Sequence, residues 1–147
     1  MPYKPETLEG VLTRFPEPAH ALTRELFNEY HFLFRITTPR KTRLGCFKGV
    51  RNGARPIIHI NSDLGPYTFL LVFLHELAHL VVMKKYGRKA KPHGVEWKNA
   101  YHLLVQPFFE QKVFPQVLTT ELQRYFIKTP ATFHRDARLI NTLSSLE

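Results

Sequence analysis

The chain has 147 residues, enough for a single domain with a modest hydrophobic core. Hydrophobic residues make up 44% of it and aromatic residues 13%, which excludes an intrinsically disordered chain. The formal net charge of +9 favours an anionic partner. The single cysteine, Cys46, excludes an intrachain disulfide and a cysteine zinc cluster. The N-terminus lacks the apolar run of a signal peptide, so we expect a cytoplasmic protein.

The first half of the chain predicts one helix followed by three strands. The helix covers 16–30, where apolar residues recur at helical spacing (Leu22, Leu26, Phe27, Tyr30). Residues 32–37 alternate as in a strand. Residues 44–50 and 57–61 predict a hairpin around the turn at 51–54, because its Asn-Gly pair favours a tight turn.

A long apolar helix is predicted over 66–86. Pro66 suits the first position of a helix, and Gly87 suits the position just after its last residue. Two lysines lie in the predicted last turn, where positive charge interacts favourably with the helix dipole. The helix is apolar on nearly all sides, so we expect it at the centre of the domain. A membrane span is the alternative, but it would bring three polar side chains to the bilayer centre (His75, Glu76, His79), and we therefore expect no membrane.

Two further helices are predicted at 95–105, where Pro107 ends the first, and at 115–126. We therefore expect an α+β domain over 1–128, with a small three-stranded antiparallel sheet packed on the 66–86 helix and on two or three further helices. Residues 129–147 are polar and weakly periodic. They predict a C-terminal tail or the start of a truncated region.

Residues His75-Glu76-Leu77-Ala78-His79 spell the HExxH pattern inside the long helix. Side chains four residues apart lie on one helix face, so His75 and His79 can offer two imidazole nitrogens to one Zn²⁺. Glu76 beside them can reach a metal-bound water as a general base. A buried helix with two hydrogen-bonded histidines is the alternative interpretation.

A catalytic zinc usually takes three protein ligands and a water. The elongated pattern with a third histidine six residues after the second is excluded, because Lys85 occupies that position. We favour His93, which lies in a loop between Pro92 and Gly94. Glu96 is the main alternative, although a carboxylate in the first turn of a helix also complements the helix dipole. Two other histidines remain as candidates (His59, His102).

The stretch HELAHLVVMKKYGRKAKPHGVEWK resembles the SprT-like domain family of zinc metalloproteases, in which HExxH precedes a variable loop and the motif H-G-x-x-W/F. The resemblance covers about residues 17–105 and implies a zincin-like minimal metalloprotease fold. It implies that His75, His79 and His93 hold Zn²⁺, that Glu76 is the catalytic base, and that the substrates are proteins associated with DNA. The chain departs from many relatives because it lacks the cysteines of a C-terminal zinc ribbon.

Positive charge is concentrated in two segments. No acidic residue lies between Glu29 and Asp63, and a second basic run separates the two halves of the metal motif. We expect both segments to contact the phosphates of DNA, single- or double-stranded. The proposed contacts are Arg40, Lys41, Arg43, Lys48, Arg51, Arg55, Lys84, Lys85, Arg88, Lys89 and Lys91. Trp97 and Tyr101 could stack on bases, but we favour core packing for both.

Two function classes follow from these patterns. The first is a zinc metalloprotease that cleaves a protein substrate with Glu76 as its base. The second is a zinc-stabilised nucleic-acid-binding module without turnover. A structural zinc usually fills four positions and needs no neighbouring carboxylate, so three histidines beside Glu76 favour catalysis.

Overall fold

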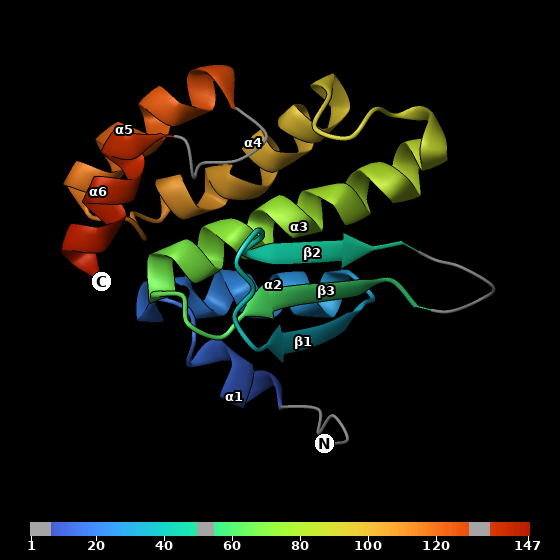
Figure 1. The fold of residues 1–147 in the computed structure, drawn as a ribbon, viewed down its shortest axis with the longest axis horizontal. Helices are drawn as coiled ribbons and strands as arrows, with labels where there is room; N and C mark the ends of the chain where they lie inside the picture. The colour runs from blue at the N-terminus through green and yellow to red at the C-terminus, as the bar shows by residue number, and fades with distance from the viewer. Residues whose placement is uncertain (1–6, 50–54, 130–135) are drawn as a thin grey trace.

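The computed structural model describes residues 7–49, 55–129 and 136–147 (Figure 1). It confirms the α+β class. The elements run in the order α1 (Leu8–Leu12), η1 (Glu17–Ala19), α2 (His20–Glu29), β1 (Leu33–Thr37), β2 (Gly45–Lys48), β3 (Ile57–Asn61), α3 (Pro66–Tyr86), η2 (Gly87–Lys89), α4 (Val95–Glu110), α5 (Gln116–Lys128) and α6 (Ala137–Leu146). Helix α3 lies between the sheet and α4 (Figure 1).

The sheet has three strands, as predicted, in the spatial order β1-β3-β2. Strands β2 and β3 pair antiparallel, which confirms the predicted hairpin, while its turn at 51–54 lies outside the described residues. The prediction of a wholly antiparallel sheet is wrong, because β1 pairs parallel with β3. The chain leaves β1, passes the end of β3 through residues 38–44, and only then forms β2, so β1 and β2 are not neighbours.

Asn61, at the end of β3, holds this crossing segment in place. Its side-chain amide donates hydrogen bonds to the carbonyls of Arg40 at 3.3 Å and Arg43 at 2.8 Å. Its amide oxygen accepts from Nε of Arg40 at 3.3 Å. Asn61 is buried, and these bonds satisfy its polar atoms. One side chain therefore sets where β2 begins.

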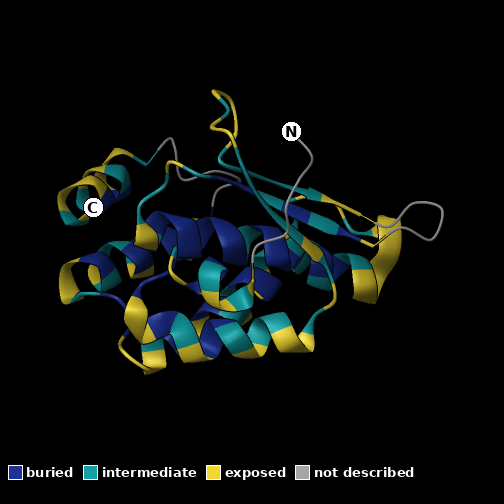
Figure 2. Ribbon diagram, turned by 90° about the horizontal axis from the view of Figure 1, so that it is seen from below, coloured by how far each residue is buried: buried dark blue, intermediate teal, exposed yellow. Residues whose placement is uncertain are grey.

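Helix α3 has the predicted bounds and is the most deeply buried helix of the fold (Figure 2). With the turn that follows, it is long and apolar enough to cross a membrane, but 61% of that apolar window is buried inside the protein. On the sheet side, Phe69 and Phe73 of α3 pack with phenylalanines from α2, β1 and their flanks (Phe15, Phe27, Phe32, Phe34). Its apolar composition thus reflects burial between two layers of protein.

Helix α4 packs along the other side of α3, and two aromatic residues anchor it. Trp97 and Tyr101 are fully buried, as expected for core residues. Tyr101 donates a hydrogen bond to the carbonyl of Leu71 at 3.0 Å. The prediction that Pro107 ends this helix is wrong, since α4 continues to Glu110. Pro107 removes only the bond to the carbonyl of Leu103, a residue that is 75% exposed to solvent, and the buried ring of Phe108 holds the last turn.

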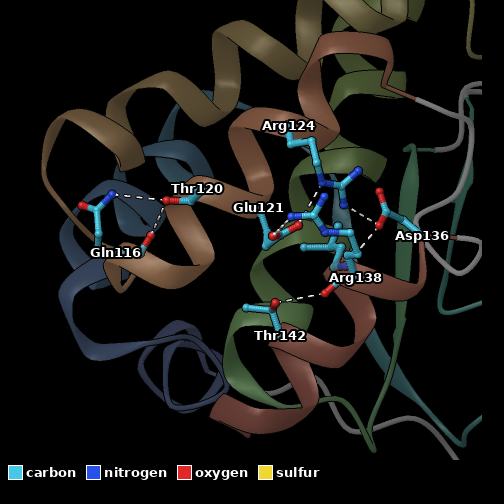
Figure 3. A network of polar contacts seen from close by, with 8 residues as sticks. Gln116, Thr120, Glu121, Arg124, Asp136, Arg138 and Thr142 are labelled. Carbon is cyan, nitrogen blue, oxygen red and sulfur yellow. Dashed lines mark hydrogen bonds and ion pairs between the residues drawn. The ribbon is translucent and has the colours of Figure 1, made fainter.

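Residues 137–147 are not a polar tail. They form α6, which buries two leucines (Leu139, Leu143) and packs on α5. An ion-pair network joins the two helices through Glu121, Arg124, Asp136 and Arg138 (Figure 3). The carboxylate of Glu147 then accepts from the backbone N–H of Thr68 at 2.8 Å and from its hydroxyl at 2.8 Å, in the first turn of α3. The end of the chain therefore stabilises the start of the central helix.

Candidate metal site

Three histidines converge between α3 and the loop that precedes α4. His75 and His79 lie one turn apart on α3. Their Nε2 atoms face Nε2 of His93, at 3.3 Å from His75 and 3.1 Å from His79. The three ligand atoms all lie within 4.8 Å of one another. The predicted trio is therefore brought together by the fold.

The backbone of His93 explains how a loop residue reaches the helix. Its φ of 57° is left-handed, which is uncommon for a residue other than glycine. Gly94 N–H donates to the carbonyl of Lys91 at 2.9 Å and closes a turn around His93. Strained backbone of this kind costs about 1–3 kcal/mol and concentrates at functional sites. Here the strain directs the imidazole toward α3.

The spacing of the nitrogens fits a metal ion. Tetrahedral coordination at about 2.0–2.1 Å separates ligand nitrogens by about 3.3–3.4 Å, close to the two distances observed. Hydrogen bonding alone is a poorer account, because each imidazole nitrogen has one in-plane lone pair or one N–H and His93 Nε2 faces two partners. A three-imidazole donor set fits Zn²⁺ and other divalent transition metals. The cluster is thus a candidate metal site.

Trp97 packs against all three imidazoles. Its ring centroid lies 4.7 Å from that of His75, 5.6 Å from His79 and 4.6 Å from His93. Its Nε1 donates to the carbonyl of His75 at 3.1 Å. On the opposite side the ring of Phe47, from β2, stacks on His79 at 6.2 Å. The sequence predicted Trp97 as a core residue but gave no sign that its ring contacts all three imidazoles.

Burial controls the protonation of these groups. It lowers the pKa of His75 well below the ordinary value, with the neighbouring histidines adding to the effect. It lowers the pKa of His79 to about 4 and, less strongly, the pKa of His93. Neutral imidazole is the form that ligates metals. Burial raises the pKa of Glu76 to about 7, although the positive charges of two arginines act in the opposite direction.

Glu76 is 7% exposed, and its Oε1 lies 3.8 Å from Nε2 of His75. It and the three histidines line one cavity of about 520 Å³. Strand β2 and the residues before it form one wall of this cavity, and the loop before α4 forms another. Gly45 permits the close approach of β2, because a Cβ there would lie 2.6 Å from Val72 Cγ1 and 3.2 Å from Glu76 Cγ.

The predicted basic residues come from two segments that differ in their position relative to the cavity. Arg43 and Lys91 line the cavity from opposite walls. The other described members lie outside its lining, some on the crossing segment and around the β2–β3 hairpin (Arg40, Lys41, Lys48, Arg55) and some at the end of α3 and in the loop that follows (Lys84, Lys85, Arg88, Lys89). Arg51 lies outside the described residues.

The alternative ligands lie elsewhere. Glu96 and His59 are not members of the cluster. His102 instead hydrogen-bonds the hydroxyl of Thr129 at 2.5 Å. Tyr86, which we considered as a carbonyl-polarising donor, is 41% exposed and does not line the cavity.

No family model, curated protein or solved structure matches this chain. The resemblance to SprT-like domains therefore rests on the motif residues themselves.

Proposed function

We propose that this chain is a zinc-dependent peptidase of the SprT type. One observation carries the proposal: a buried carboxylate, Glu76, lines the same cavity as three converging imidazoles. Three ligands leave one coordination position for water or substrate, whereas a structural zinc usually fills all four. In the metal-free chain, burial raises the pKa of this carboxylate to about 7. A carboxylate beside a metal-bound water can accept and then release a proton.

In this proposal His75, His79 and His93 hold the ion, which supplies Lewis-acid polarisation of the scissile carbonyl and a more acidic water. Glu76 takes a proton from the attacking water and donates it to the leaving nitrogen. Trp97 keeps the imidazoles oriented through its contacts with all three rings.

An extended polypeptide is the substrate class that best suits the cavity. Strand β2 forms one wall, and within the described residues it pairs only with β3. Its other edge is therefore available for main-chain hydrogen bonds to an added strand. Apolar side chains nearby (Phe47, Val82, Met83) can receive an apolar substrate side chain. A folded domain would not enter a cavity of about 520 Å³.

We extend the proposal to proteins bound to DNA, in the cytoplasm. Its support is the net charge of +9, the two arginines near Glu76, and the free cysteine, which suits a reducing compartment.

The test is cleavage of an unstructured protein by the zinc-loaded chain, with and without single-stranded DNA. Glu76→Gln should keep the fold and the zinc but lower the cleavage rate by at least about 10²-fold, the usual contribution of a positioned base. Glu96→Gln is the matched control, because it removes a nearby carboxylate that is outside the cluster. It should leave the rate unchanged.

Zinc content measured on every variant separates the outcomes. Equal cleavage by Glu76→Gln and the parent chain would refute the role of Glu76. Zinc bound with no cleavage under any condition would favour the non-catalytic nucleic-acid-binding module. Loss of zinc from Glu76→Gln would make the carboxylate a ligand or an anchor of the ligands, and the mechanism above would be wrong.

A further inference from the structure

Arg43 lines the cavity of the candidate metal site, and the fold holds it there. The side-chain amide of Asn61 donates to the carbonyl of Arg43 at 2.8 Å, and the backbone N–H of Asn61 donates to the carbonyl of Leu44 at 2.9 Å. The guanidinium donates from Nη1 to Sγ of Cys46 at 3.4 Å. The backbone of Arg43 is therefore fixed where the β2 wall begins, and the contact with Cys46 orients its charged group.

The lining of the cavity offers Arg43 no carboxylate partner. Within the described residues, Glu76 is the only acidic residue of the lining, and no ion pair joins it or any other carboxylate to Arg43. The sequence has no acidic residue at 30–62 or at 77–95, so neither the β2 wall nor the loop before α4 supplies one. Lys91, on the opposite wall, adds a second positive charge. Positive charges therefore outnumber negative ones in the described lining.

The charge and the apolar surface of this wall lie at different ends. Strand β2 runs alongside α3 in the same direction (Figure 1). A Cβ on Gly45 would lie 3.2 Å from Cγ of Glu76, and a Cβ on Gly49 would lie 2.8 Å from Sδ of Met83. Arg43 precedes Gly45 and so lies toward the Glu76 end. The apolar side chains of the cavity lie toward the C-terminal end of α3 (Phe47, Val82, Met83).

We propose that Arg43 binds a carboxylate of the substrate, so that the cavity selects a polypeptide with an acidic group near an apolar side chain. The inference rests on the proposed peptidase function and deepens it by naming a class of substrate. A guanidinium presents its N–H donors in a rigid plane and pairs with a carboxylate through two parallel hydrogen bonds. Arg43 is thus a specificity-determining residue.

The length of the wall sets the spacing of the two recognised groups. Arg43 and Phe47 are four residues apart. A strand added to the edge of β2 advances by about 3.3 Å per residue, as β2 itself does, and its side chains at even separations point to the same side. A substrate whose acidic and apolar residues are four positions apart therefore reaches both ends of the wall.

Fluorescent peptides of matched sequence test this preference. Each is unstructured, carries one leucine, and has Glu, Gln or Lys four residues before or after it, with both chain ends blocked. The zinc-loaded chain should bind the Glu peptide about two- to fivefold more tightly than the Gln peptide, the range that exposed ion pairs contribute, and the Lys peptide least tightly. A Gln peptide with a free C-terminal carboxylate is the second arm. Preference for this peptide alone would support the site and assign it to chain ends.

Variants of Arg43 separate its role from attraction by the metal ion. Arg43→Gln should abolish the preference for Glu, Arg43→Lys should keep part of it, and Arg43→Glu should reverse it in favour of the Lys peptide. Lys128→Gln, on α5, is the matched control, because it removes an exposed positive charge outside the lining of the cavity. It should keep the preference. Zinc content and thermal stability should match those of the parent chain in all four variants.

The proposal is overturned if the parent chain binds the Gln peptides as tightly as the Glu peptide, or if Arg43→Gln keeps the preference. It is also overturned if Arg43→Gln weakens binding of a single-stranded oligonucleotide but not of the Glu peptide, which would make Arg43 a nucleic-acid contact. Mass spectrometry of the peptides scores cleavage separately. Intact peptides with an Arg43-dependent preference would refute the peptidase function and support the carboxylate site, whereas cleavage without preference would do the reverse.

Discussion

Trp97→Phe should weaken metal binding in addition to destabilising the fold. The substitution removes the indole N–H that donates to the carbonyl of His75, and it leaves a gap beside the three imidazoles. The lost hydrogen bond costs about 1 kcal/mol, and the residual cavity costs about 1 kcal/mol more. The free energy of unfolding should fall by about 2 kcal/mol, which lowers the Tm by about 4–8 °C for a chain of this size.

The effect on the metal comes from orientation. With one wall missing, the imidazoles sample more ring positions, and loss of such supporting contacts typically costs about 10–100-fold in metal affinity. Tyr101→Phe is the matched control. Tyr101 is also a buried α4 aromatic that donates to a carbonyl of α3, and its ring lies 5.8 Å from that of His75, with no ring contact to His79 or His93 among the described residues. It should lose about 1 kcal/mol of stability and keep its metal affinity.

The assay pairs thermal unfolding of the chelated chain with a zinc competition titration of the folded chain. Unfolding without metal separates the packing effect from stabilisation by the bound ion. If Trp97→Phe and Tyr101→Phe lower stability and leave zinc affinity equal to that of the parent chain, Trp97 is only a core residue and the reasoning is refuted.

Two further predictions concern the third ligand and the network between α5 and α6. His93→Ala should lower zinc affinity by an order of magnitude or more, while Glu96→Ala should not, as measured by metal content after dialysis; the reverse pattern would make Glu96 the ligand. Asp136→Asn should cost about 0.5–1 kcal/mol at pH 7. The hydrogen bond from Arg124 holds the pKa of Asp136 below its ordinary value, so this stabilisation is present above the unfolded pKa of about 3.9 and is lost as pH falls through the folded pKa. The difference in Tm between Asp136→Asn and the parent chain should therefore shrink as the pH is lowered from 7 to 3. A difference that stays constant over this range would contradict the ion-pair account.

Local signals predicted the parts of the site that depend on local structure. The bounds of α3 follow from Pro66 and Gly87, and the i, i+4 spacing places His75 and His79 together whatever the rest of the fold does. His93 was predicted because the proline and glycine beside it mark a loop that can return to the helix, whereas its left-handed backbone was not predicted. In each case the residues that decide the geometry lie within a few positions of the site.

Features that depend on distant contacts were missed. The polar composition of residues 129–147 predicted a tail. In the structure, α6 packs on α5 through only two buried leucines, Leu139 and Leu143. The ion pairs between the two helices each need one residue from either side, so they cannot be recognised from one segment alone. Pro107 read as a helix end, because the sequence does not reveal that the last turn of α4 is held by the burial of Phe108. Alternation of apolar and polar residues likewise identifies a strand such as β1, but it does not show which strand lies beside it or whether the two run parallel.

The parallel pairing of β1, which the sequence did not reveal, is also the feature that gives the candidate site an open wall. Had β1 paired with β2, as in a simple antiparallel meander, β2 would be a central strand with both edges occupied. The crossing segment held by Asn61 instead carries the chain past β3, so that β2 becomes an edge strand. Gly45 then lets this edge strand approach Val72 and Glu76. The unpaired strand edge and the buried carboxylate therefore meet at one cavity because of the same chain crossing, and this arrangement is what allows an extended polypeptide to be the proposed substrate.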